Sequence, residues 1–269
     1  MTRGDEIGYE PGRPAGYAAQ PDEALNYVDA HDNETLYDAL AYKLPTDTDP
    51  EQRARAHLLA LGVATLGQNP VLWHAGVDLL RSKSLDRNSY DSGDWFNLFD
   101  VTGADHGFGR GLPQAGDNRA AWGIAGPLLA DPALRPGGAL VRSVHERALD
   151  LLRLRASSRL FRLGSAANIA DKVSFPASGT WAQRPGVILM LLDDSRGVPV
   201  DPDAAALLVV ANALPWSVHQ PLPPAVGNGW ELHPIQARGA DPVVRRARVD
   251  DGAAAIAGRT LAVFRRPRG

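Results

Sequence analysis

The residues best suited to chemistry lie in two polar segments of the chain. The first, His31-Asp32-Asn33, follows the apolar run around Tyr27-Val28 and joins an imidazole, a carboxylate and an amide. A short apolar run that stops at polar residues is typical of a buried strand carrying side chains to its C-terminal end. Two roles stay open from these residues alone. They could take part in catalysis, or the Asp-Asn pair could cap a following helical turn while His31 is satisfied in the core.

The second polar segment, Arg81–Asn97, concentrates carboxylates, amides, cations and aromatic rings within one loop. A sugar carries many hydroxyl groups and has apolar ring faces, so its binding site needs hydrogen-bonding side chains beside an aromatic surface. The segment supplies both kinds of group. A solvated loop held together by its own Asp and Ser turn bonds has the same composition, and that alternative also stays open.

Several elements must position these segments. Leu25–Val28 and Pro70–His74 are predicted as buried strands, and Thr35–Tyr42 as a helical turn. A helix is predicted from the capping residue Asp49 to about Leu66. Residues 75 to about 142 are rich in Gly, Asp, Ser and Asn and are expected to form a long loop region of the kind that often carries function.

The second half of the chain has a different pattern. The capping-box spacing that starts at Ser143 predicts a helix running to about Ser157. Short apolar runs at 187–192, 207–211 and 260–264, separated by Pro and Gly, then predict an antiparallel β-sandwich. We therefore expect two domains, residues 1–158 and residues 159–269.

Composition narrows the function classes. The 269 residues carry a net charge of −3, which gives no support for a nucleic-acid partner or an anionic membrane. No apolar run has the roughly 20 residues of a membrane span. The absence of cysteine removes disulfides, thiolate catalysis and thiolate-bound zinc. His57 and His74 lie on different elements without an evident third ligand, so packing roles are favoured and neither a metal nor a cofactor is expected. The N-terminus shows no signal peptide, and localisation stays open.

A resemblance rests on several of these segments together. The chain resembles the pullulanase-type α-1,6-glucosidases of the α-amylase superfamily, retaining glycoside hydrolases, in motifs spread along nearly its whole length. The resemblance is carried by Tyr27-Val28 before His31-Asp32-Asn33, by Thr35-Leu36, by His74–Ser84, by Ser89–Asn97, by Gly111-Leu112-Pro113 and by Arg155–Leu163.

The resemblance implies a fold and a set of site residues. It implies α/β structure followed by all-β structure: the last two strands and helices of a (β/α)8 TIM barrel, then the β-sandwich. Asp32 would be the carboxylate that stabilises the transition state, and His31 would donate a hydrogen bond to the same sugar. Further substrate-binding residues by position in the loop would be Arg81, Lys83, Asn88, Tyr90 and Asp94.

The chain also departs from that family. The motifs that bear the nucleophile and the acid/base precede the seventh barrel strand in these enzymes, and only 24 residues precede Leu25. We therefore expect a C-terminal fragment of a debranching enzyme that acts on α-1,6 branch points in pullulan, limit dextrin, starch or glycogen. It would be inactive alone and would need a separate N-terminal part as partner. The alternative is a non-catalytic module that binds α-glucan oligosaccharides or another partner.

Overall fold

The computed structural model describes residues 4–268 and divides into two compact units. The helical unit comprises Tyr27–Thr65 and Leu72–Leu152, and the sheet unit comprises the chain up to Asn26, Leu66–Val71 and the chain from Arg153 onward. Secondary structure is mixed, with helices in both units and antiparallel sheets in the sheet unit.

Three helices organise the helical unit, and two of them begin at a capping side chain. The Thr35 hydroxyl accepts a hydrogen bond from the Asp38 backbone at the start of α1 (Leu36–Lys43). The Asp49 carboxylate does the same for Gln52 at the start of α2 (Pro50–Thr65). Both helices confirm the predicted elements. Apolar residues of α1, α2 and α6 (Gly138–Ser157) share one core, among them Ala41, Ala54 and Val144.

The helix α6 begins five residues before the predicted capping box. The apolar periodicity continues backward to Val141, which is buried against the same core as Val144. Burial of this extra turn outweighs the weak helix propensity of Gly138, so the predicted start at Ser143 is wrong.

The region between residues 75 and 142 contains short helices rather than only loop. The longest, α5 (Trp122–Ala130), was hidden from sequence patterning because Gly123, Gly126 and Pro127 all disfavour helix. The burial of Leu128 and Leu129 offsets the low helix propensity of these three residues. The other short helices are η3 (Val77–Leu79), η4 (Ser89–Asp91), α3 (Asp94–Asn97), α4 (Ala115–Asn118), η5 (Arg119–Ala121) and η6 (Pro132–Leu134).

The two predicted strands at 25–28 and 70–74 are reduced to a single contact. Asn26 and Val71 form an isolated parallel bridge, and the Asn26 N–H donates to the Pro70 carbonyl at 2.9 Å. Parallel strands are stable within larger sheets covered on both faces, and no other strand among residues 4–268 extends this pair. The segments therefore run side by side as predicted but do not form regular strands.

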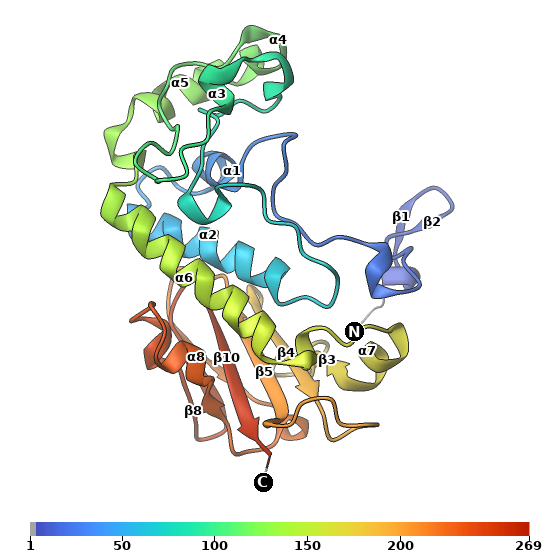
Figure 1. Ribbon diagram of the computed structural model, residues 1–269. Coiled ribbons are helices and arrows are strands. Elements are labelled where there is room, and N and C mark those ends of the chain that lie inside the picture. The colour runs from blue at the N-terminus through green and yellow to red at the C-terminus, as the bar shows by residue number, and fades with distance from the viewer. Residues whose placement is uncertain (1–3, 269) are drawn as a thin grey trace. The chain divides into compact units, whose positions relative to one another are not determined.

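Two larger antiparallel sheets lie in the described part of the sheet unit, besides the short β1-β2 pair, and the strand pattern predicted antiparallel sheets here (Figure 1). The larger has the order β3-β4-β5-β10-β7 and the smaller the order β6-β9-β8. Residues of both sheets, such as Leu208, Phe264 and Ile256, meet in one core. The strands are β3 (Val173–Ser174), β4 (Val187–Asp193), β5 (Ala204–Asn212), β6 (Val218–Pro221), β7 (Glu231–Leu232), β8 (Arg248–Asp250), β9 (Ala253–Ile256) and β10 (Thr260–Pro267).

Shorter elements complete this unit. A hairpin of β1 (Gly8–Glu10) and β2 (Arg13–Pro14) lies near the N-terminus, flanked by η1 (Gly4–Glu6) and η2 (Pro21–Glu23). The remaining helices are η7 (Arg159–Phe161), α7 (Ala166–Lys172), η8 (Pro224–Val226), α8 (Pro234–Ala237) and η9 (Val244–Arg246).

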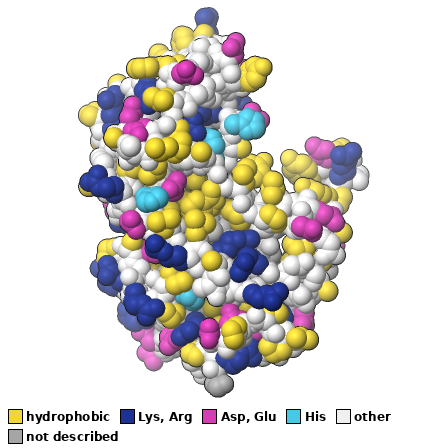
Figure 2. Space-filling model, in the orientation of Figure 1, with side chains coloured by type: hydrophobic (Ala, Val, Ile, Leu, Met, Phe, Trp, Pro, Cys, Tyr) yellow, Lys and Arg dark blue, Asp and Glu magenta, His cyan; other side chains and the backbone are white. Residues whose placement is uncertain are grey.

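The surface carries both signs of charge. Figure 2 shows Lys and Arg side chains interspersed with Asp and Glu on the face in view, as expected from a net charge near zero. Within residues 4–268, no helix is both long and apolar enough to cross a membrane.

Candidate functional site

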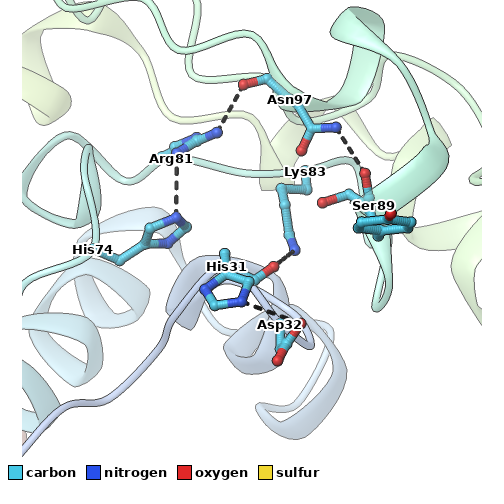
Figure 3. Close-up of a pocket in the computed structure, with 8 residues that line it drawn as sticks. His31, Asp32, His74, Arg81, Lys83, Ser89 and Asn97 are labelled. Atoms are coloured by element: carbon cyan, nitrogen blue, oxygen red, sulfur yellow. Dashed lines mark hydrogen bonds and ion pairs between the residues drawn. The ribbon is translucent and has the colours of Figure 1, made fainter.

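A pocket of about 290 Å³ within the helical unit gathers most of the residues expected to bind a ligand. Five of the seven predicted site residues line it, and Figure 3 shows how most of them converge. The pocket is lined by His31, Asp32, His74, Arg81, Lys83, Ser89, Tyr90 and Asn97. Two segments separated by about fifty residues of sequence thus form one site.

His31 and Asp32 stand at the open side of the pocket. Their side chains are 87% and 71% exposed, and the His31 Nε2 lies 3.6 Å from the Asp32 Oδ1. The turn that carries them is closed by Asn33, whose backbone adopts the left-handed conformation at φ 59°. The alternative in which His31 is satisfied in the core is therefore wrong, and the residue that caps the following helix is Thr35.

Lys83 forms the inner wall of the pocket. Its side chain is buried, and its Nζ donates a hydrogen bond of 2.9 Å to the carbonyl of His31. Burial lowers the pKa of this ammonium group, while the charges of Asp38 and Asp86 oppose that shift. Lys83 thus ties the loop that carries it to the turn at His31.

Arg81 is held by four partners around the same pocket. Its guanidinium donates to the carbonyls of Ala75 and Asn97, at 3.1 and 2.8 Å, and lies over the ring of Phe99. One of its nitrogens also lies 3.3 Å from the Nε2 of His74. Burial lowers the pKa of Arg81. With so many bonds made to the protein, Arg81 shapes the pocket wall.

His74 is a pocket residue that the sequence reasoning assigned to packing. Because a guanidinium can only donate, the His74 Nε2 must accept from Arg81, which places the proton on Nδ1. That nitrogen lies 3.6 Å from the buried carboxylate of Asp29. The position of His74 in the sequence did indicate a site role, because it ends the second predicted strand much as His31 follows the first.

The remaining two predicted residues lie outside this pocket. Asn88 lines a neighbouring depression of about 380 Å³ together with Asp32, Asn33, Arg87 and Asp117, and its Nδ2 donates to the Asp117 carboxylate at 2.8 Å. Asp94 begins α3 and lines neither space. Asp32 is thus shared between the two spaces.

The loop between these residues is braced from inside. The buried Asp86 carboxylate accepts hydrogen bonds from the Asn88 backbone, the Ser92 hydroxyl and the Asn118 amide. The alternative of a loop held by its own turn bonds is therefore correct for Asp86 and Ser92. It does not describe Tyr90, whose side chain is 94% exposed at the edge of the pocket.

The arrangement suits recognition of a polar, uncharged ligand. An exposed carboxylate, an exposed imidazole and an exposed phenol offer acceptors, donors and an apolar ring face, while the two cations are engaged by protein groups. Across the described residues 4–268, no three His, Cys, Asp or Glu side chains are arranged to hold a metal ion.

Comparisons with known proteins agree with this geometry. Residues 103–267 match the family model described as "Alpha-1,6-glucosidases, pullulanase-type, C-terminal". The chloroplastic pullulanase 1 of Arabidopsis thaliana is 39% identical over 98% of this chain, and the pullulanase of Klebsiella pneumoniae is 34% identical over 99%. The chain spans 28% and 24% of the lengths of these two relatives, about a quarter.

Solved structures give the same result. The apo pullulanase of Klebsiella pneumoniae superposes with a TM-score of 0.90 at 34% identity, covering 99% of this chain and 29% of that one. The same organism's pullulanase in complex with maltotriose superposes with a TM-score of 0.89 over 100% of this chain and 25% of that one. The fold is that of the C-terminal region of carbohydrate-active enzymes. The chain belongs to the pullulanase-type α-1,6-glucosidases and corresponds to their C-terminal portion.

Proposed function

We propose that this chain provides the C-terminal part of a debranching enzyme that hydrolyses α-1,6-glucosidic bonds in α-glucans such as pullulan, limit dextrin, starch or glycogen. The observation that carries the proposal is the exposed pair His31 and Asp32 at the mouth of a pocket whose inner wall is formed by Arg81 and Lys83. The maltotriose complex of the related Klebsiella pneumoniae pullulanase supports an α-glucan oligosaccharide as the ligand.

Asp32 is proposed to act on the transition state. Its exposed carboxylate can accept hydrogen bonds from sugar hydroxyls and favour the positive charge that develops on the sugar ring during retaining hydrolysis. His31 donates to the same sugar. Tyr90 offers its ring at the pocket edge, and Asn88 contributes from the neighbouring depression.

The nucleophile and the acid/base are proposed to come from a separate N-terminal part of the enzyme. The motifs that bear them in this family are expected before the seventh barrel strand, and the relatives are about four times as long as the matched region. Residues 1–158 would then complete a (β/α)8 barrel with their last two strands and helices, and residues 159–269 would form the β-sandwich domain. The parallel bridge between Asn26 and Val71 supports adjacent barrel strands.

Calorimetric titration of the purified chain with maltotriose tests the site. We expect saturable binding that Asp32→Asn weakens by about tenfold, the typical effect of one hydrogen bond to a charged group. The variant should keep its fold, because Asp32 is exposed. Asp47→Asn, at an exposed position outside the pocket, is the matched control. Equal affinities of Asp32→Asn and the parent chain would contradict the assignment of Asp32.

An activity assay tests the catalytic claim. The purified chain should release no reducing sugar from pullulan, and addition of an N-terminal pullulanase segment should restore release. Hydrolysis by the chain alone would refute the claim. Binding of maltotriose without any restoration would favour the alternative of a non-catalytic glucan-binding module, which the completeness of the pocket within one unit also allows.

A further inference from the structure

The buried carboxylate of Asp38 lies directly behind the pocket and is not one of its lining residues. Asp38 occupies the first turn of α1. Its Oδ1 accepts from the Ser82 hydroxyl at 2.5 Å and its Oδ2 from the Lys83 backbone at 2.7 Å. The Leu85 backbone N–H also interacts favourably with this carboxylate and lowers its pKa, against the larger raising effect of burial. One side chain thus accepts hydrogen bonds from two successive residues of the loop, Ser82 and Lys83.

The loop that Asp38 holds has a backbone that needs external support. Leu80, Ser84 and Leu85 all adopt the left-handed conformation, with φ of 56°, 53° and 65°. None is glycine, so each side chain clashes locally and the conformation persists only where surrounding bonds fix it. The two hydrogen bonds to Asp38 fall within this segment, and the Ser82 hydroxyl also accepts from the Ser84 backbone at 2.9 Å.

The same carboxylate connects both walls of the pocket. The turn at His31 and Asp32 leads directly into α1, which carries Asp38, while the loop it anchors carries Arg81 and Lys83. Figure 3 shows the Lys83 side chain extending from that loop to the carbonyl of His31. A shift of the loop would therefore withdraw the support of His31 and change the position of Arg81 together.

We propose that Asp38 is a positioning residue for glucan binding, which fixes the loop at Ser82–Leu85 on α1 and thereby sets the distance between His31-Asp32 and Arg81-Lys83. This inference rests on the proposed function, because it concerns the same pocket. Asp38 does not line the pocket and acts through Lys83 and Ser82.

Two variants weaken the hydrogen bonds between Asp38 and the loop, one by changing α1 and the other by changing the loop. Asp38→Asn keeps the shape of the side chain but turns one acceptor into a donor that faces Ser82 or Lys83. Ser82→Ala leaves α1 intact and removes one donor from the loop, and it serves if Asp38→Asn fails to fold. Asp49→Asn is the control, because the Asp49 carboxylate likewise accepts a backbone hydrogen bond, from Gln52, but lies outside the pocket.

Three measurements on the full chain decide the proposal. We expect the Kd for maltotriose to rise about tenfold in Asp38→Asn and severalfold in Ser82→Ala, without change in the control. Amide hydrogen exchange at Lys83 and Leu85 should accelerate at least about tenfold in Asp38→Asn. The amide resonance of Asp32, which shares its peptide group with the His31 carbonyl, should shift in both anchor variants.

The outcomes separate this inference from the proposed function. A variant that loses stability but keeps the parent Kd and the parent Asp32 resonance would overturn it, since Asp38 would then be only structural. If the parent chain does not bind maltotriose, the proposed function fails and the binding role of Asp38 fails with it. Exchange at Lys83 and Leu85 then still decides whether Asp38 holds the loop, and unchanged exchange in both variants would refute that as well.

Discussion

A buried charge cluster in the sheet unit gives the sharpest stability prediction. The Asp194 carboxylate follows β4 and is fully buried, and the Lys172 Nζ at the end of α7 lies 3.0 Å from its Oδ1. The Oδ2 accepts from Arg268 and from the backbone of Asp201. Burial opposes ionisation of Asp194, but the hydrogen bonds from Asp201 and Lys172 bring its pKa below the usual value.

The two ends of this pair should respond unequally to substitution. Asp194→Asn leaves the buried Lys172 ammonium without its counterion, so we expect a loss of about 3–5 kcal/mol in the free energy of unfolding. Lys172→Met replaces the ammonium side chain with an uncharged side chain of similar volume. The Asp194 carboxylate then keeps its hydrogen bonds from Arg268 and from two backbone N–H groups. That variant should lose only about 1–3 kcal/mol. The double variant should lose about 1–3 kcal/mol less than the sum of the two.

Urea unfolding followed by amide hydrogen exchange in β4 and β5 measures these losses in the sheet unit itself. Local exchange is preferable to a single global signal because two compact units need not unfold in one transition. Asp250→Asn, which breaks an exposed ion pair with Arg248, is the matched control and should cost less than about 0.5 kcal/mol. If Lys172→Met proves as costly as Asp194→Asn, the reasoning from residual partners is refuted.

Two further predictions concern pH and backbone conformation. Burial lowers the pKa of His233 to about 4, and its neutral Nδ1 accepts from the Ile235 backbone at the start of α8. The unfolded chain therefore binds more protons than the native one between about pH 6.5 and 4, so stability should fall as the pH falls through that range. His233→Asn should flatten the dependence in urea titrations, and an unchanged slope would contradict the assignment. Gly107→Ala should cost about 2–4 kcal/mol, because φ is 91° and a Cβ would lie 2.3 Å from the Ser82 carbonyl. Gly179→Ala, with positive φ and no described atom within 4 Å, should cost only about 1 kcal/mol in the same measurement.

Local rules predicted the elements whose stability depends on neighbouring residues in sequence. Thr35 and Asp49 cap α1 and α2 because the donors they satisfy lie three residues ahead. The strands β4, β5 and β10 follow from apolar runs bounded by Pro and Gly. Prediction was weaker where tertiary burial determines whether a segment is helical. In α5, Pro127 and two glycines disfavour a helix, but Leu128 and Leu129 are buried.

The candidate site shows the same division between local and tertiary information. His31, Asp32, Arg81, Lys83 and Tyr90 lie in the two polar segments and were named as site residues through the family resemblance, and the pocket brings them together. His74 and Asp38 were not predicted as site residues. Their roles depend on contacts with Arg81 and with the Ser82–Lys83 segment, and no spacing rule in the sequence announces such long-range partners.

The polar and aromatic groups in and around the pocket serve two separate purposes, and burial distinguishes them. Lys83 and Asp86 are buried and make their bonds to protein groups, so they fix the loop and the turn at His31. Asp32 and Tyr90 are exposed at the pocket and keep their surfaces for a ligand. A neutral sugar gains little from a buried cation that it cannot reach, but it gains from acceptors and ring faces held in fixed positions. The polar density that marks the Arg81–Asn97 segment in the sequence therefore includes the hydrogen bonds that hold a strained loop, and exposed groups such as Tyr90 are the ones left open to a ligand.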